Sequence, residues 1–310
     1  MNFLNYIKGL AGNDAIKRYL SWAGMGLGVL GIVFIVIKLA QYNGQIDYSR
    51  LTLFDWLAFA GLALLYGVAS WALLPWAWHN LLKHYGVSAG LLWSMRTYGL
   101  SQLAKYVPGN IFHLASRQAI GVSAGLPGWP LAKSTFWDLV LEAISGVFFG
   151  VLVLPSFFPG INTGETVIIF VFALAVYLLA VARWWSRWVA YAAAAYTLFL
   201  AFAGINFVLV LSLWSGSESL PVVSICGAYV VAWLIGLITP GAPAGAGVRE
   251  LVLYALLHSS IPQTDLLYVI VIGRIVTIIG DVVFYGLALA MNKIWPAEKF
   301  QVEQKIAPAE

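Results

Sequence analysis

Two arginines in an otherwise apolar chain follow a pair of helix-breaking residues at the same distance. A Pro-Gly pair at positions 240–241 lies nine residues before Arg249, and another at positions 108–109 lies nine residues before Arg117. Proline lacks a backbone N–H group and glycine relaxes the backbone, so we expect no continuous helix through either pair. A short helix that begins after such a break presents unpaired N–H groups and a positive dipole end, which favour an anion. Because a guanidinium group binds two phosphate oxygens at once, the two segments predict a phosphate or carboxylate site.

Eight charged side chains are expected at membrane depth, where each costs about 2.5–3.5 kcal/mol on insertion scales. Pairing between cations and carboxylates would offset this cost. Two hypotheses stay open for these groups. They form structural salt bridges, or the cations bind a ligand while the carboxylates pair with them or carry a coupling proton. The cations are Lys105, Arg117, Arg249 and Arg274, and the carboxylates are Asp138, Glu142, Glu250 and Asp281.

Glycines near the breaks would let the backbone come close to a bound group. Together with the cations and the breaks themselves, they make up the predicted substrate-binding set. This set is Lys105, Pro108, Gly109, Asn110, Arg117, Pro240, Gly241, Gly245, Gly247, Arg249 and Arg274.

The sequence contains no motif for a metal site, nucleotide hydrolysis or a catalytic triad. The single cysteine excludes an internal disulfide and a cysteine-based metal site, and the four histidines lack the spacing of metal ligands. No Walker-type phosphate-binding motif occurs, and no Ser-His-Asp arrangement can be read from the sequence. We therefore expect no catalytic residue, no metal and no cofactor.

The elements that must position these residues are apolar helices. Of the 310 residues, 61% are hydrophobic and 10% are charged, which is unlike a soluble globular protein. Runs of about 20 apolar residues are long enough to cross a bilayer. The sequence predicts one all-α polytopic membrane domain over residues 1–310, with a mobile tail at 292–310. The expected spans are 19–40, 53–82, 129–154, 166–182, 188–213 and 265–291.

The distribution of lysine and arginine indicates the orientation of the chain. These residues occur before the first span, after the second span, and at positions 183 and 187 between the fourth and fifth spans. The loops 155–165 and 215–220 contain none. Both termini are therefore predicted to be cytoplasmic, which requires an even number of crossings. Six full spans satisfy this if residues 87–126 and 221–258 are broken re-entrant hairpins. The alternative is that residues 221–239 simply span the membrane.

A constant shift of 132 residues maps the first broken segment onto the second. The same shift maps residues 53–82 onto 185–214 and Pro130 onto Pro262. Because three crossings separate the two hairpins, the halves would have opposite orientations. The sequence thus predicts an inverted repeat, with repeat one over about 19–155 and repeat two over about 166–291. Such repeats place a site near the bilayer midplane between the halves.

The two broken segments resemble the transmembrane flippase-like family of lysylphosphatidylglycerol synthases and their stand-alone relatives. The resemblance implies an integral inner-membrane protein that moves a lipid or a lipid-linked head group between leaflets. The soluble aminoacyl-transferase domain of the full synthases is absent, so we do not expect the chain to make lysyl lipid itself. The residues that carry the resemblance are 105–110 with Arg117, residues 240–250 with Gly245, Gly247, Arg249 and Glu250, and the later Glu142 and Arg274.

The leading functional hypothesis is a flippase or transporter for a phosphate-bearing lipid, either an aminoacylated phospholipid or a polyprenyl-phosphate-linked sugar. The alternatives are a membrane-embedded transferase that acts on a lipid phosphate, with Glu142 or Asp138 as base, and a structural membrane subunit. A transporter is favoured over an enzyme. We expect a bacterial cytoplasmic (inner) membrane location and a membrane lipid with an anionic head group as partner. A homo-oligomer and a functional link to separate lipid-modifying or glycosyltransferase enzymes are left open, and nucleic acid is not expected.

Overall fold

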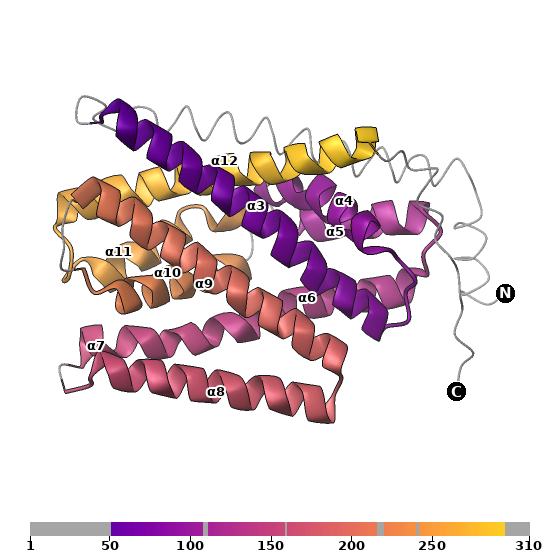
Figure 1. Ribbon diagram of the computed structural model, residues 1–310, viewed down its shortest axis with the longest axis horizontal. Helices are drawn as coiled ribbons and strands as arrows, with labels where there is room; N and C mark the ends of the chain where they lie inside the picture. The colour runs from indigo at the N-terminus through magenta and orange to yellow at the C-terminus, as the bar shows by residue number, and fades with distance from the viewer. Residues whose placement is uncertain (1–50, 108–110, 159, 216–219, 240–241, 295–310) are drawn as a thin grey trace.

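The computed structural model describes residues 51–107, 111–158, 160–215, 220–239 and 242–294, and in these residues it contains helices and no strand (Figure 1). The expected span at 19–40 and the tail beyond residue 294 lie outside the described residues. The same holds for five predicted site residues at the two breaks, namely Pro108, Gly109, Asn110, Pro240 and Gly241.

Five helices of the described chain are long and apolar enough to cross a membrane. They coincide within a few residues with the spans expected at 53–82, 129–154, 166–182, 188–213 and 265–291. The protein is therefore all-α, with the helix lengths and compositions of a membrane-embedded chain. The long helices are α3 (Leu53–His84), α6 (Gly128–Phe148) with its continuation through η3 (Phe149–Val153) and α7 (Leu154–Phe157), α8 (Thr163–Trp184), α9 (Arg187–Ser215) and α12 (Gln263–Ile294).

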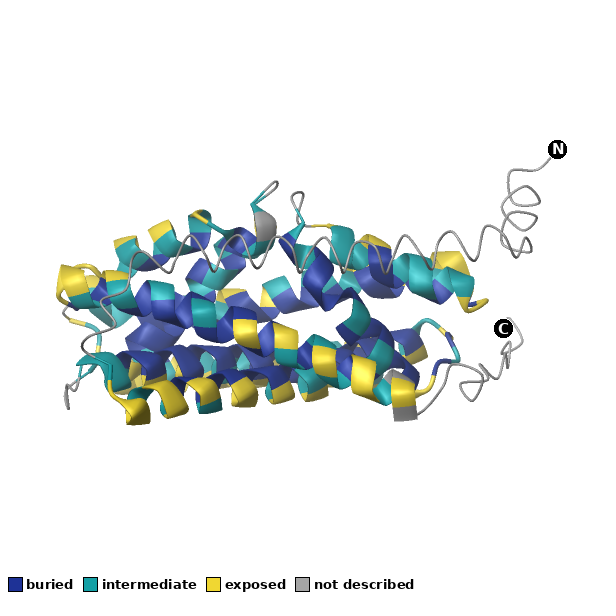
Figure 2. Cartoon of the chain, turned by 90° about the horizontal axis from the view of Figure 1, so that it is seen from above, coloured by how far each residue is buried: buried dark blue, intermediate teal, exposed yellow. Residues whose placement is uncertain are grey.

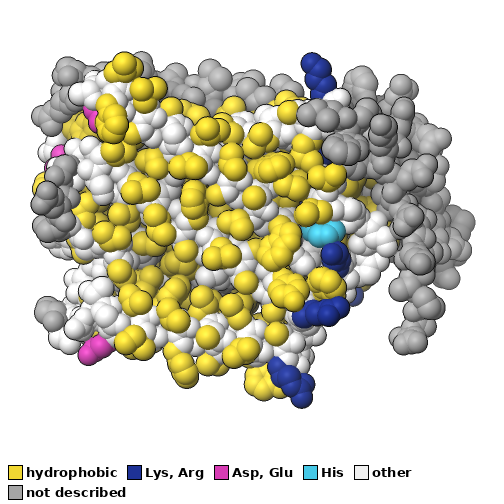
Figure 3. Space-filling view, in the orientation of Figure 1, with side chains coloured by type: hydrophobic (Ala, Val, Ile, Leu, Met, Phe, Trp, Pro, Cys, Tyr) yellow, Lys and Arg dark blue, Asp and Glu magenta, His cyan; other side chains and the backbone are white. Residues whose placement is uncertain are grey.

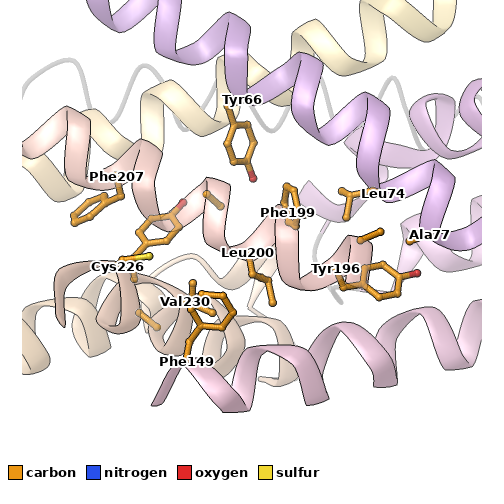
Figure 4. Close-up of a cluster of buried hydrophobic side chains, with 14 of the residues drawn as sticks. Tyr66, Leu74, Ala77, Phe149, Tyr196, Phe199, Leu200, Phe207, Cys226 and Val230 are labelled. Carbon is orange, nitrogen blue, oxygen red and sulfur yellow. The ribbon is translucent and has the colours of Figure 1, made fainter. Parts of the chain in front are cut away.

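Helix α9 is the central helix of the bundle, and α8 is peripheral. In the most apolar stretch of α9, 67% of the residues are buried, against 6% in α8. Buried residues gather where helices face one another, whereas exposed residues follow their outer faces (Figure 2). The core that forms around α9 contains Tyr196, Phe199, Leu200 and Phe207 from α9, Tyr66 and Leu74 from α3, and Phe149 and Val230 (Figure 4).

Helices α3 and α12 cross at two glycines. A Cβ atom on Gly67 would lie 2.6 Å from the carbonyl oxygen of Gly280, and a Cβ on Gly280 would lie 2.6 Å from Cδ1 of Tyr66. The missing side chains therefore set the distance between the two helices. The residues next to these glycines, Tyr66 and Asp281, both line the cavity described below.

Both broken segments are helical on either side of the break. In the first, α4 (Leu91–Gln102) runs into η2 (Leu103–Tyr106) and is followed by α5 (Phe112–Ser123). In the second, α10 (Val222–Ile238), η4 (Pro243–Gly245) and α11 (Val248–Leu257) follow one another. In each segment the two limbs contact each other, so the chain folds back at the break. Helix α10 has 17 residues, which is shorter than the roughly 20 residues of a full span.

The two hairpins open towards opposite ends of the bundle, and their breaks meet between the ends. The first hairpin starts after α3 and leads into α6, whereas the second starts after α9 and leads into α12 (Figure 1). At the breaks, η2 contacts η4, and Leu103 and Tyr106 pack with Ala244. The bundle thus has a hairpin at each end, and the tips of the two hairpins contact each other near its middle.

The ends of the bundle differ in charge (Figure 3). At the end where the first hairpin opens, cations occupy the last turns of α3 and α8 and the start of α9. At the other end, α3, α8 and α12 each have a carboxylate in their first turn, and two of these carboxylates form capping boxes. The cations are Lys83, Arg183 and Arg187, and the carboxylates are Asp55, Glu165 and Asp265.

Candidate functional site

A partly open cavity lies beside η2 and η4, the segments that contact each other at the two hairpin breaks. Helices α3, α6, α9 and α12 and both hairpins contribute side chains to its lining. Five of the eight charged residues singled out from the sequence line this cavity. They are Lys105, Glu142, Arg249, Arg274 and Asp281.

Asp281 of α12 receives three donors from the first hairpin. Lys105 Nζ lies 2.8 Å from its Oδ1, and Gln102 Nε2 donates to the same oxygen at 3.1 Å. The hydroxyl of Tyr106 donates to Oδ2 at 2.5 Å. Because Asp281 is 2% exposed, these bonds satisfy a carboxylate that would be costly to bury alone. The cluster ties the tip of the first hairpin to α12.

Arg274 of α12 makes the corresponding connection to the second hairpin. Its Nε lies 2.7 Å from Glu250 Oε1, and its Nη2 donates to the carbonyl oxygen of Ala244 at 3.3 Å. The other oxygen of Glu250 accepts from the backbone N–H of Gly247 at 2.6 Å, which closes the start of α11. One helix, α12, thus holds both hairpin tips through charged groups of opposite sign.

The glycine-rich turn of the second hairpin uses backbone conformations that favour glycine. Gly245 and Gly247 have φ values of +73° and +86°, and between the break and α11 Ala244 also has a positive φ of 49°. A Cβ on Gly245 would lie 2.9 Å from the Cα atom of Gly236 on the other limb. In the described structure the close approach at Gly245 is therefore one between the two limbs of the hairpin.

Arg249 is the cation of the cavity wall without a counter-ion among the described residues. Its side chain is 6% exposed, and its Cζ lies 4.5 Å from the centre of the Tyr229 ring on the opposite limb. Its Nη2 is buried and has no hydrogen-bond partner in the described part of the chain. A buried guanidinium stacked on an aromatic ring keeps its donors available in the plane of the fork, which is the geometry that binds phosphate oxygens.

Arg117, its counterpart in the first hairpin, does not line the cavity. The side chain is fully buried, and its Nη1 lies 2.7 Å from Asp138 Oδ2 on α6. The hydroxyl of Tyr196 donates to the other oxygen of Asp138. The guanidinium group also lies 3.6 Å from the centre of the Tyr98 ring. Arg117 and Asp138 thus have the geometry of a structural ion pair that fastens α5 to α6 behind the cavity wall.

Glu142 lines the cavity but has no ion pair and no hydrogen bond among the described residues. It is 7% exposed and lies one turn after Asp138 on the same face of α6. One further turn along this face, Gly146 packs against Leu234 of α10 and Leu200 of α9. Asp138 on the same face is engaged by Arg117 and Tyr196, whereas Glu142 lines the cavity.

The cavity is partly open, and its less buried lining residues lie on the hairpins. The lining residues of α3, α6, α9, α11 and α12 are all buried. The partly exposed lining residues belong to the hairpin limbs beside the breaks, and the residues next to the breaks, Ile111 and Ile238, are 61% and 59% exposed. The partly exposed lining residues are Lys105, His113, Trp233, Leu237 and Ala244.

Several polar lining residues were not singled out from the sequence. Tyr98, Gln102 and Tyr106 are spaced four residues apart, which places them on one face of the α4–η2 segment. This spacing next to Lys105 could have identified the three residues from the sequence. No comparable pattern identifies His113, whose buried Nδ1 has no hydrogen-bond partner in the described residues. Among the described residues, no group of three His, Cys, Asp or Glu side chains could hold a metal ion.

Comparison with known proteins does not identify this site. Neither the models of protein families nor the curated proteins give a match to the chain.

Proposed function

We propose that the protein is an integral membrane transporter of the flippase type, which moves a phosphate-bearing lipid between leaflets. The observation that carries this proposal is the buried Arg249, which lines a polar cavity and has no counter-ion among the described residues. The cavity that Arg249 lines is partly open beside the two hairpins. A head group could occupy the polar cavity while its acyl chains stay in the bilayer.

The architecture that we propose for this function is an inverted repeat of six spans, five of them described, with 19–40 as the sixth. Two features of the described structure support it. In each hairpin an arginine of the second limb stacks on a tyrosine of the first, Arg117 on Tyr98 and Arg249 on Tyr229. The two hairpins also open towards opposite ends, as opposed repeats would.

The orientation follows from the charged ends. Because lysine and arginine are enriched on the cytoplasmic side of membrane proteins, we place the end with Lys83, Arg183 and Arg187 in the cytoplasm of a bacterial cell, together with both termini. This proposal, like membership of the flippase-like family of lysylphosphatidylglycerol synthases, rests on residues of the chain. Aminoacylated phospholipids and polyprenyl-phosphate-linked sugars both have the phosphate that Arg249 requires. Enzymes that make such lipids would be its functional partners.

Lipid movement in proteoliposomes tests the proposal. The protein is reconstituted with chain-labelled fluorescent phospholipids, and an impermeant quencher reports which molecules have changed leaflet. Arg249→Lys keeps the charge but loses the planar fork, so the loss should be about 1.5–3 kcal/mol, or roughly ten- to a hundredfold in lipid affinity. Arg187→Lys at the exposed basic end is the matched control and should move lipid like the wild type.

Two results would contradict the proposal. One is a wild-type protein that moves no phospholipid, and the other is an Arg249→Lys protein with unchanged movement. Mass spectrometry of the lipids after the assay distinguishes the transferase alternative, because a transferase would leave a chemically altered lipid and a transporter would not.

A further inference from the structure

We propose that Glu142 forms a subsite for the ammonium group of a zwitterionic lipid whose phosphate binds at Arg249. This inference rests on the proposed function and narrows its substrate to lipids whose head group has one phosphate and one amine, with no net charge.

The charges of the cavity wall lead to this assignment. Lys105 is paired with Asp281 at 2.8 Å, and Arg274 is paired with Glu250 at 2.7 Å. After these pairs are formed, one cation and one carboxylate of the wall have no counter-ion among the described residues, namely Arg249 and Glu142. Each is more than nine-tenths buried.

A buried guanidinium and a buried carboxyl group that are both unpaired among the described residues match a ligand with an anionic and a cationic group. A phosphate would compensate the charge of Arg249, and an ammonium group would stabilise the ionised form of Glu142. A head group with a phosphate alone would satisfy Arg249 but leave the carboxylate of Glu142 facing another anion. A head group with two amines would exceed the single free carboxylate.

The position of Glu142 suits an ammonium group. Its neighbours on the same face of α6 are engaged, because Asp138 is bound to Arg117 and Tyr196 and Gly146 packs on Leu200. The same cavity wall includes the rings of Tyr98, Phe199 and Trp233. Aromatic faces attract ammonium groups, and the attraction grows where water is excluded.

The test uses three chain-labelled lipids that differ only in the head group. These are a phosphoethanolamine lipid, the same lipid with its amine acetylated, and a phosphoglycerol lipid. Acetylation removes the positive charge while the phosphate stays. We expect the wild type to move the phosphoethanolamine lipid about tenfold or more faster than the other two, since a hydrogen bond between charged groups is lost in both. Glu142→Gln should abolish this preference.

Glu165→Gln is the matched control, because Glu165 is an exposed carboxylate at the acidic end and glutamine can also cap a helix. This variant should keep the preference. Glu142→Asp retains a carboxylate and should keep part of the preference. This variant tests the subsite even if Glu142→Gln does not fold. A melting curve for each variant shows which of them are folded.

The outcomes separate the two proposals. If the wild type moves all three lipids alike and Arg249→Lys slows all three, the transporter stands and the ammonium subsite is wrong. A Glu142→Gln protein that keeps the preference, or that slows all three lipids equally, also overturns the subsite. If the wild type moves none of them, both proposals fail.

Discussion

Arg117 and Arg249 both follow a hairpin break by the same distance, but among the described residues only Arg117 is paired with a carboxylate. Asp138 supplies that carboxylate on α6. The position 132 residues later is 138 + 132 = 270, and Ile270 of α12 stands there. Ile270 lines a second, much smaller cavity together with Arg249. One apolar residue in place of a carboxylate therefore leaves the second arginine available to a ligand.

The pair Arg117–Asp138 is expected to be essential for folding. Removing one partner leaves the other charge buried and uncompensated, so Asp138→Ala should destabilise the protein by about 3–5 kcal/mol. The double variant Asp138→Leu with Arg117→Leu should recover part of that loss, since it buries no charge. Melting temperatures in detergent measure both effects, and an Asp138→Ala protein as stable as the wild type would contradict the structural role.

Arg249 is expected to behave in the opposite way. Because its guanidinium has no counter-ion among the described residues, Arg249→Leu removes a buried charge without stranding another. We expect a melting temperature at or above that of the wild type together with a loss of lipid movement. A variant that loses stability and activity together would instead identify Arg249 as a structural residue.

The candidate site could be predicted in part from the residues alone. Charged residues at membrane depth and paired helix breaks identified Lys105, Arg249, Arg274, Glu142 and Asp281, all of which line one cavity. From the sequence, Arg117 and Arg249 were predicted to have the same role, because spacing does not show which carboxylate lies close to each arginine. The packing of helices that are distant in the sequence decides which charged groups pair, and this packing cannot be predicted from residue types.

At the scale of elements, the crossing of α3 and α12 depends on Gly280. A Cβ there would lie 2.9 Å from the carbonyl oxygen of Ala63 as well as against the Tyr66 ring, so the helices would have to separate. We expect Gly280→Ala to cost about 1–3 kcal/mol, the range for overpacking in a tight interior. Gly286→Ala, six residues later on α12, is the control, because its Cβ would have nothing within 4 Å. Equal melting temperatures for the two variants would count against the crossing.

The long helices and the breaks were predictable for physical reasons. Twenty apolar residues can satisfy their backbone in a bilayer only as a helix, and proline with glycine interrupts one. The boundaries of α3 and α9 follow the apolar runs closely. The packing order was not predictable, because α8 and α9 are both apolar helices although 6% of the most apolar stretch of one and 67% of that of the other is buried. In a membrane, the apolar face of a helix can meet lipid as well as protein.

At the scale of the molecule, the hairpins should make each pair of flanking residues accessible from one side. With Cys226 replaced by alanine, single cysteines at Ser88 and Ser123 should both react with an impermeant reagent from the cytoplasm. Cysteines at Ser215 and Ser260 should both react from outside, because the second hairpin opens at the acidic end. Reaction of Ser88 and Ser123 from opposite sides would show that the first broken segment crosses the membrane.

The ion pair between Lys105 and Asp281 also has a consequence for the order of events during synthesis and membrane insertion. The two residues are 176 positions apart, so the lysine leaves the ribosome long before its counter-ion exists. At about 5–20 residues per second, the interval is roughly 9–35 s. During that time the first hairpin must wait at the water interface or in the shelter of the insertion machinery. Nascent chains truncated before α12 are therefore expected to leave this hairpin open to protease, and full-length chains to protect it.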